Sequence, residues 1–128
     1  RKLVIRRAND RCEYCHLSQI GQEASFHVDH IVPSASGGET VSENLALACV
    51  SCSLRKGAKE FAIIEGTEKK IRLFHPRENN WNDHFEWHGA LLKGKTSTGK
   101  ITTELLNMNR KLILAIREEE ILLKRHPG

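Results

Sequence analysis

The segment HVDHIVPSASGG, residues 27–38, decides the fold of this chain because two cysteine pairs enclose it. Cys12-x-x-Cys15 precedes the segment, Cys49-x-x-Cys52 follows it, and the 128 residues contain no other cysteine. A two-residue gap lets both thiolates of a pair reach one ion, and four thiolates complete the tetrahedral coordination of Zn²⁺. The sequence therefore predicts a structural zinc site bound by all four cysteines.

Two disulfides or a redox-active Cys-x-x-Cys motif are the alternatives to zinc. Disulfides are typical of small secreted domains, and no signal peptide precedes these cysteines, which favours a cytoplasmic protein. A redox role would require two separate redox-active Cys-x-x-Cys motifs in one chain. A structural metal would also fold a region too small to bury its own core, so zinc is the favoured ligand.

Composition and charge limit the classes of partner. A hydrophobic content of 39% and a charged content of 28% suit a globular protein, and no apolar run is long enough for a membrane helix. The formal net charge of +4 mildly favours a polyanion. One Zn²⁺ and four thiolates would lower it to +2, because four negative charges are added against two positive ones.

The pattern of residues predicts an α+β fold with a zinc-bound core at 1–60 and a C-terminal extension at 61–128. Within the core we expect a helix, two short strands, a loop and a second helix capped by Ser42. Their predicted bounds are 2–9 for the first helix, 24–28 and 31–32 for the strands, 33–40 for the loop and 44–56 for the second helix.

The extension is expected to contain short strands and two helices. The predicted strands cover 70–74 and 90–95, and Thr98 and Asn109 are the expected caps of helices that end near Asn107 and Arg125. Apolar residues cover more of the last helix than one narrow stripe. This helix therefore either completes the core or offers a docking surface to a protein partner.

Asp29 and His30 supply the residue types that hydrolysis of a phosphodiester requires. A histidine titrates near neutral pH and can take a proton from water, and a carboxylate is a hard oxygen ligand for a divalent cation. Alternate residues of a strand share a face. His27 and Asp29 would therefore point together, with His30 opposite unless the turn rotates it.

Several motifs in order resemble the zinc-containing form of the HNH endonuclease family over roughly residues 11–57. They are Cys-x-x-Cys, Asp-His-Ile-x-Pro, Gly-Gly, Asn44-Leu45, a second Cys-x-x-Cys and Arg55-Lys56-Gly57. The resemblance implies a ββα-metal core, in which a two-stranded hairpin packs on a helix around a catalytic Mg²⁺ or Mn²⁺. It also implies cleavage of DNA, with RNA not excluded, by water that attacks the phosphodiester.

The resemblance also implies roles for individual residues. Asp29 would be a ligand of the catalytic metal, His30 the general base, and Asn44 the residue that holds the loop and orients His30. Ser53 stands where the family usually has His or Asn, and its hydroxyl is a poorer metal ligand. His27 or His84 is therefore a further candidate to complete the metal site.

Arg55, Lys56 and Lys59 follow the second cysteine pair and are candidate phosphate contacts, or simply cations on a solvated helix end. Two functions compete with the nuclease. One is a nucleic-acid-binding zinc module whose catalytic site is weakened or inactive at Ser53. The other is an interaction domain of a larger assembly.

Overall fold

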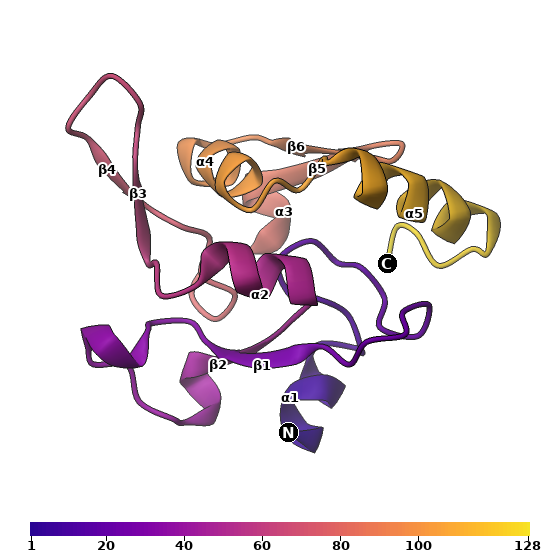
Figure 1. Ribbon diagram of the computed structural model, residues 1–128, viewed down its shortest axis with the longest axis horizontal. Coiled ribbons are helices and arrows are strands. Elements are labelled where there is room, and N and C mark those ends of the chain that lie inside the picture. The colour runs from indigo at the N-terminus through magenta and orange to yellow at the C-terminus, as the bar shows by residue number, and fades with distance from the viewer.

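Five helices and six short strands make up the secondary structure of the chain (Figure 1). The computed structural model describes residues 1–128. The helices are α1 (Lys2–Arg7), α2 (Val50–Lys56), α3 (Trp81–His84), α4 (Ser97–Leu105) and α5 (Lys111–Leu122). The strands are β1 (His27–His30), β2 (Leu45–Ala48), β3 (Phe61–Ile63), β4 (Lys70–Arg72), β5 (Phe85–His88) and β6 (Leu91–Gly94). No helix combines the length and apolar character that a membrane span requires.

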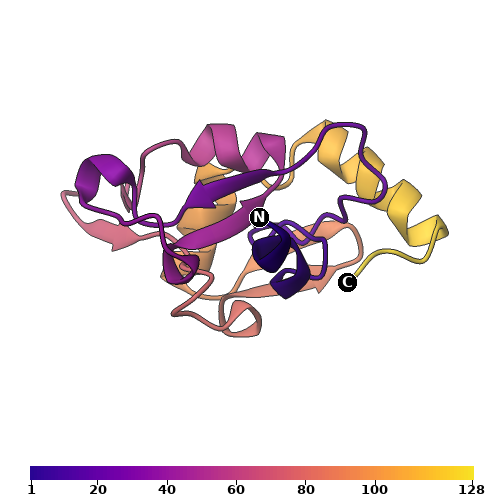
Figure 2. The same cartoon turned by 90° about the horizontal axis from the view of Figure 1, so that it is seen from below.

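The strands form three separate antiparallel hairpins, β1–β2, β3–β4 and β5–β6, so the predicted α+β class is confirmed. The first hairpin and α2 form the expected ββα unit. In both views α2 lies on one side of this hairpin and α1 on the other (Figures 1 and 2). Each face of a two-stranded sheet that is covered by a helix can bury apolar side chains, which explains why so short a hairpin is stable.

The prediction of the second strand was wrong. Ile31 and Val32 begin the loop, and β1 pairs instead with Leu45–Ala48, which the sequence placed in a helix. Leu and Ala are strong helix formers, but three of these four residues are buried between the hairpin and its neighbours, and tertiary packing overrides their propensity. Helix α2 therefore begins only at Val50.

Local capping also differs from expectation. Ser42 lies in a 3₁₀ turn (Ser42–Asn44), and the N-cap of α2 is Cys49, whose sulfur accepts a hydrogen bond from the Cys52 amide. In the extension the cap of α4 is Thr96, because its hydroxyl accepts from the Gly99 amide.

Asn109 does not cap α5. Its side-chain amide instead accepts from the Leu92 N–H and donates to the Leu92 carbonyl, at 2.9 and 2.8 Å. The amide thus pairs with the main chain of β6 as another strand would. An asparagine just before a helix can cap that helix or bond to a neighbouring main chain through the same side-chain amide. The sequence alone therefore does not distinguish the two roles.

The two predicted parts of the chain share one hydrophobic cluster. It includes Tyr14, Leu47 and Ile31 from the first 60 residues and Phe74 and Leu92 from the rest. Polar interactions also join the two parts, among them a 2.8 Å hydrogen bond from the Trp81 indole N–H to the Tyr14 carbonyl. The extension therefore packs on the region that contains the four cysteines.

Helix α5 divides its apolar residues between core and surface. Ile113 is fully buried, whereas Leu112 is 67% and Leu122 77% exposed. Arg117 on the same helix is buried and donates to the carbonyl oxygens of Ala90 and Met108 at 2.9 and 2.6 Å. The buried guanidinium satisfies main-chain acceptors that the short loops leave without partners.

Candidate zinc and nuclease sites

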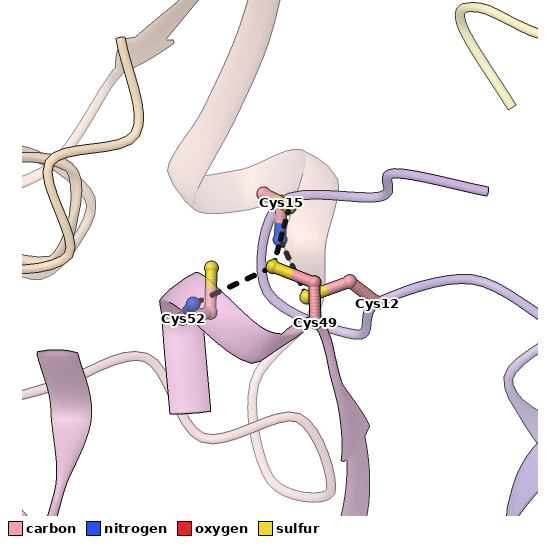
Figure 3. Close-up of side chains that lie close together, drawn as sticks. All are labelled: Cys12, Cys15, Cys49 and Cys52. Atoms are coloured by element: carbon pink, nitrogen blue, oxygen red, sulfur yellow. Dashed lines mark hydrogen bonds between the residues drawn. The ribbon is translucent and has the colours of Figure 1, made fainter. Parts of the chain in front are cut away.

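The four cysteines converge as predicted (Figure 3). Their sulfur atoms all lie within 4.8 Å of one another, and every one of the four residues is buried. Cys15 Sγ and Cys49 Sγ are 3.8 Å apart. Tetrahedral coordination with Zn–S bonds of about 2.3 Å separates sulfurs by about 3.8 Å. The cluster is therefore compatible with structural zinc.

Each cysteine pair forms a tight turn whose main chain points at a sulfur. The Cys15 amide lies 3.5 Å from Cys12 Sγ, and the Cys52 amide lies 3.4 Å from Cys49 Sγ. The left-handed backbone of His16, with φ 64°, turns the chain directly after the first pair. These amide donors stabilise negative charge on the sulfurs and so favour the thiolate form that binds metal.

The pKa values of the thiols show why four buried sulfurs need a cation. Burial raises the pKa of Cys12 well above its usual value. Hydrogen bonds from Cys12, Cys15 and Cys52 hold the pKa of Cys49 below its usual value. A Zn²⁺ ion coordinated by all four would supply the charge that lets the others ionise.

The second site begins on β1, where His27 and Asp29 lie on the face of the hairpin that is covered by α2. Their cross-strand partners are Ala48 and Ala46, both fully buried. His27 Nδ1 is 2.7 Å from Ser53 Oγ on α2. The structure thus brings together a histidine and the serine that occupies the last motif position.

His30 lies on the opposite face of the hairpin, as strand alternation requires, and is the last residue of β1. Its Nε2 is 2.8 Å from Thr40 Oγ1 in the loop that leads to β2. Asp29 and His30 therefore project from the two sides of one strand end. Both side chains are only partly buried, so substrate can approach them.

Asn44 closes the loop between the strands. Its side chain accepts from the Val32 N–H at 2.8 Å and donates to the Val32 carbonyl at 3.0 Å and to the Glu39 carbonyl at 2.9 Å. The Asn44 carbonyl also accepts from the Ile31 N–H. Four hydrogen bonds from one residue thus fix the backbone that follows His30.

The Gly37-Gly38 pair makes this closed loop possible. Gly37 has φ 90°, which only glycine adopts readily. A Cβ on Gly38 would collide with the Val32 carbonyl oxygen and crowd the Asn44 amide nitrogen. The two glycines are therefore required because the loop passes close to the Val32 carbonyl and the Asn44 side chain, which we call the Asn44 clamp for its hydrogen bonds across the loop.

The three basic residues after the second cysteine pair have different surroundings. Arg55 and Lys59 are exposed. Lys56 is only 2% exposed, burial lowers its pKa, and its ammonium group donates to the His30 carbonyl at 3.2 Å. A direct phosphate contact by Lys56 does not fit this placement, because the side chain points into the interior behind His30.

Helix α1 and the residue before it supply further exposed cations, which lie outside the sequence motifs. Arg7 donates to the Leu45 carbonyl at 2.6 Å, and Leu45 is the cross-strand partner of His30. Arg1, Lys2, Arg6 and Arg7 are all exposed, and none of them lies within salt-bridge distance of a carboxylate. The signal was present in the opening RKLVIRR, which contains four basic residues and no acidic one.

His84 belongs to the extension rather than to the hairpin site. Its Nδ1 is 2.6 Å from Thr96 Oγ1, and its ring packs against that of Phe74 with centroids 6.0 Å apart. These contacts give His84 a structural role in the extension. Of the two histidines considered for the metal site, His27 is the one that contacts Ser53.

Comparison with known proteins finds similarities to the first part of the chain and to one longer protein. The family model described as HNH endonuclease matches residues 12–59. Septu protein PtuB from Bacillus thuringiensis is 25% identical over 109 residues, which cover 84% of this chain and 40% of that protein. The chain thus spans less than half the length of this relative. No solved structure matches this chain. Over residues 12–59 the chain is therefore similar to the HNH endonuclease family, as the sequence motifs predicted.

Proposed function

We propose that the chain is a metal-dependent endonuclease that cleaves a phosphodiester of DNA with water activated by His30. The observation that carries this proposal is the placement of His30 and Asp29 on the two sides of one strand end. In phosphoryl transfer the attacking and departing oxygens lie roughly in line through phosphorus. A base on one side of the strand end and a cation ligand on the other suit a phosphate that lies across it.

His30 is prepared for the role of general base by its neighbours. The hydrogen bond between Nε2 and Thr40 Oγ1 leaves Nδ1 as the nitrogen that can take a proton from water. The side chain of Asn44 and the Lys56 ammonium hold the main chain at the His30 carbonyl and directly after it. A general base positioned in this way contributes about 10²–10⁴-fold to the rate.

Asp29, Ser53 and His27 are the residues available to hold a catalytic Mg²⁺ or Mn²⁺ on the α2 side. Their carboxylate, hydroxyl and imidazole groups are donors that such ions accept in proteins. When bound there, the cation would supply positive charge for the scissile phosphate and the departing 3′ oxygen. The products would carry a 5′ phosphate and a 3′ hydroxyl.

Exposed cations on both sides of the site support a nucleic-acid substrate. Arg55 and Lys59 lie at and after the end of α2, and Arg7 lies beside the cross-strand partner of His30. Lysine and arginine contacts to phosphates give affinity that is independent of base sequence. We propose that the nucleic-acid backbone passes between these two groups.

The test is cleavage of supercoiled plasmid DNA by the zinc-loaded protein with Mg²⁺, with Mn²⁺ and with EDTA, beside a single-stranded RNA of matched length. We expect nicking only with a divalent cation, and a loss of about 10²–10⁴-fold in His30→Ala with zinc content and thermal stability unchanged. Equal cleavage by His30→Ala and the unsubstituted protein would exclude His30 as the base.

Ser53 favours a second function, that of a nucleic-acid-binding zinc module. Its hydroxyl is occupied by His27 and is a weak metal ligand. This function predicts salt-sensitive DNA binding without cleavage under any divalent cation. A gain of cleavage in Ser53→Asn would identify a weakened enzyme, whereas binding with no cleavage in either form would support the module.

A further inference from the structure

We propose that His27, and not Ser53, is the protein ligand that joins Asp29 in holding the catalytic cation, and that Ser53 acts by holding the His27 ring. The inference rests on the proposed metal-dependent function and names the ligand set of that same site. It also reverses the role that the family resemblance implied for Ser53.

The hairpin register carries the first step. His27 and Asp29 are two positions apart on β1 and share the face toward α2. The residues opposite them on β2 are alanines, whose methyl groups fill little of the space between hairpin and helix. The larger side chains of His27 and Asp29 therefore provide the polar atoms on this face, with Ser53 and Lys56 facing them from α2.

The hydrogen bond between His27 and Ser53 carries the second step. A histidine that binds metal through one ring nitrogen almost always has the other held by a hydrogen-bond partner. Here Nδ1 is held at 2.7 Å by Ser53 Oγ, and Ser53 is 9% exposed, so the partner is itself fixed. When Nδ1–H donates to Ser53, the lone pair of Nε2 is free to bind a cation.

Charge at the site indicates which cations it prefers. Mg²⁺ favours oxygen ligands and depends on carboxylates. This face has one carboxylate, Asp29, and the nearby Lys56 ammonium interacts with its negative charge. An imidazole adds a ligand without adding charge and suits Co²⁺, Ni²⁺ and Zn²⁺ better than Mg²⁺. The site should therefore bind Co²⁺ and Mn²⁺ more tightly than Mg²⁺.

The decisive experiment is electron spin echo envelope modulation of Mn²⁺ added to the zinc-loaded protein without nucleic acid. We expect modulation from a directly bound imidazole nitrogen. This modulation should disappear in His27→Ala. It should persist in His30→Ala, the matched control, because His30 lies on the opposite face of the hairpin. Nitrogen modulation that survives in His27→Ala, or Mn²⁺ that binds with oxygen ligands alone, would overturn the inference.

Affinity measurements extend the test to Ser53. Calorimetric titration with Co²⁺ should show a loss of affinity of more than about 100-fold in His27→Ala and of about 10–100-fold in Ser53→Ala, because removal of a ligand's hydrogen-bond partner typically costs about 10–100-fold. His27→Asp should restore binding and shift preference toward Mg²⁺. If Ser53→Ala bound Co²⁺ more weakly than His27→Ala, Ser53 would instead be the direct ligand.

These readouts separate the inference from the function on which it rests. Bound Mn²⁺ with an imidazole signal and no cleavage of any nucleic acid would refute the nuclease and leave the ligand set standing. Cleavage that is retained in His27→Ala, with unchanged Mn²⁺ affinity, would refute the ligand set and leave the nuclease standing. Unchanged zinc content in each variant excludes unfolding as the cause.

Discussion

The four-cysteine cluster and the candidate site at the end of β1 are built in opposite ways. Cys12, Cys15, Cys49 and Cys52 are buried, belong to two tight turns and offer four ligands of one kind. The site at the end of β1 is partly exposed and combines different donors from a strand and a helix. Structural metal sites are closed and catalytic ones keep a position open. On the proposed function, the closed site would stabilise the fold and the open site would accept substrate.

Zinc removal should have the largest effect. Cys52→Ser, or treatment with a strong chelator, is expected to unfold residues 12–59 and loosen the extension, because structural zinc supplies about 10–16 kcal/mol of apparent binding free energy in small zinc domains. Circular dichroism during thermal unfolding, with zinc content measured in parallel, would show it. Asp29→Ala is the control, since it alters the open site alone. An unchanged melting temperature after zinc removal would contradict a structural role.

Opening the loop clamp should have the next largest effect. Asn44→Ala removes hydrogen bonds to Val32 and Glu39 and leaves their groups unpaired, at a cost of about 1–3 kcal/mol in the free energy of unfolding. Cleavage should fall while zinc content stays constant. Ser42→Ala, in the same 3₁₀ turn, is the control. Chemical denaturation and plasmid nicking would be compared for both variants, and equal losses would show that the clamp has no special role.

The cations of α1 should affect binding more modestly. Arg7→Gln, in a His30→Ala background that prevents cleavage, should weaken DNA binding and reduce the slope of log affinity against log salt concentration by about 1. Lys93→Gln on β6 removes an exposed cation from the extension and serves as the control. Fluorescence anisotropy over a salt series would measure both. Identical slopes for the two variants would place the DNA away from α1.

The smallest effect is expected when the Thr40 hydroxyl, which is hydrogen-bonded to His30, is removed. Thr40→Val removes one exposed hydrogen bond to His30, and such bonds contribute about 0.5–1.5 kcal/mol. Cleavage should therefore fall by no more than about tenfold. Thr40→Ser should restore most of the rate. A pH–rate profile of all three forms would show whether Thr40 tunes the base, because a purely structural role would leave the profile unchanged.

The contrast between the two sites also explains what could be predicted from the sequence. The zinc cluster was predictable because each Cys-x-x-Cys pair forms its own turn, so local spacing contains the geometry. The strand partner of β1 was not, since Leu45–Ala48 consists of helix formers and becomes a strand only through long-range pairing. Motifs that depend on one turn are visible in sequence, and those that depend on packing are not.

The same limit applies to single side chains of the site. The alternation of β1 correctly placed His27 with Asp29, but nothing in the sequence showed that Ser53 would contact His27. Lys56 looked like any cation at a helix end, and only packing reveals that it is buried behind His30. The roles of these residues in catalysis stay predictions until the variants are measured.

The shared core has a practical consequence for the design of a shorter version of this chain. Trp81 reaches across to Tyr14, and its ring stacks on that of His16 with centroids 3.9 Å apart, directly beside the first cysteine pair. A fragment trimmed after residue 60 would bare this apolar surface to water. Trimming at the boundary that sequence motifs suggest would therefore yield an aggregating product, and a usable truncation has to retain the tail.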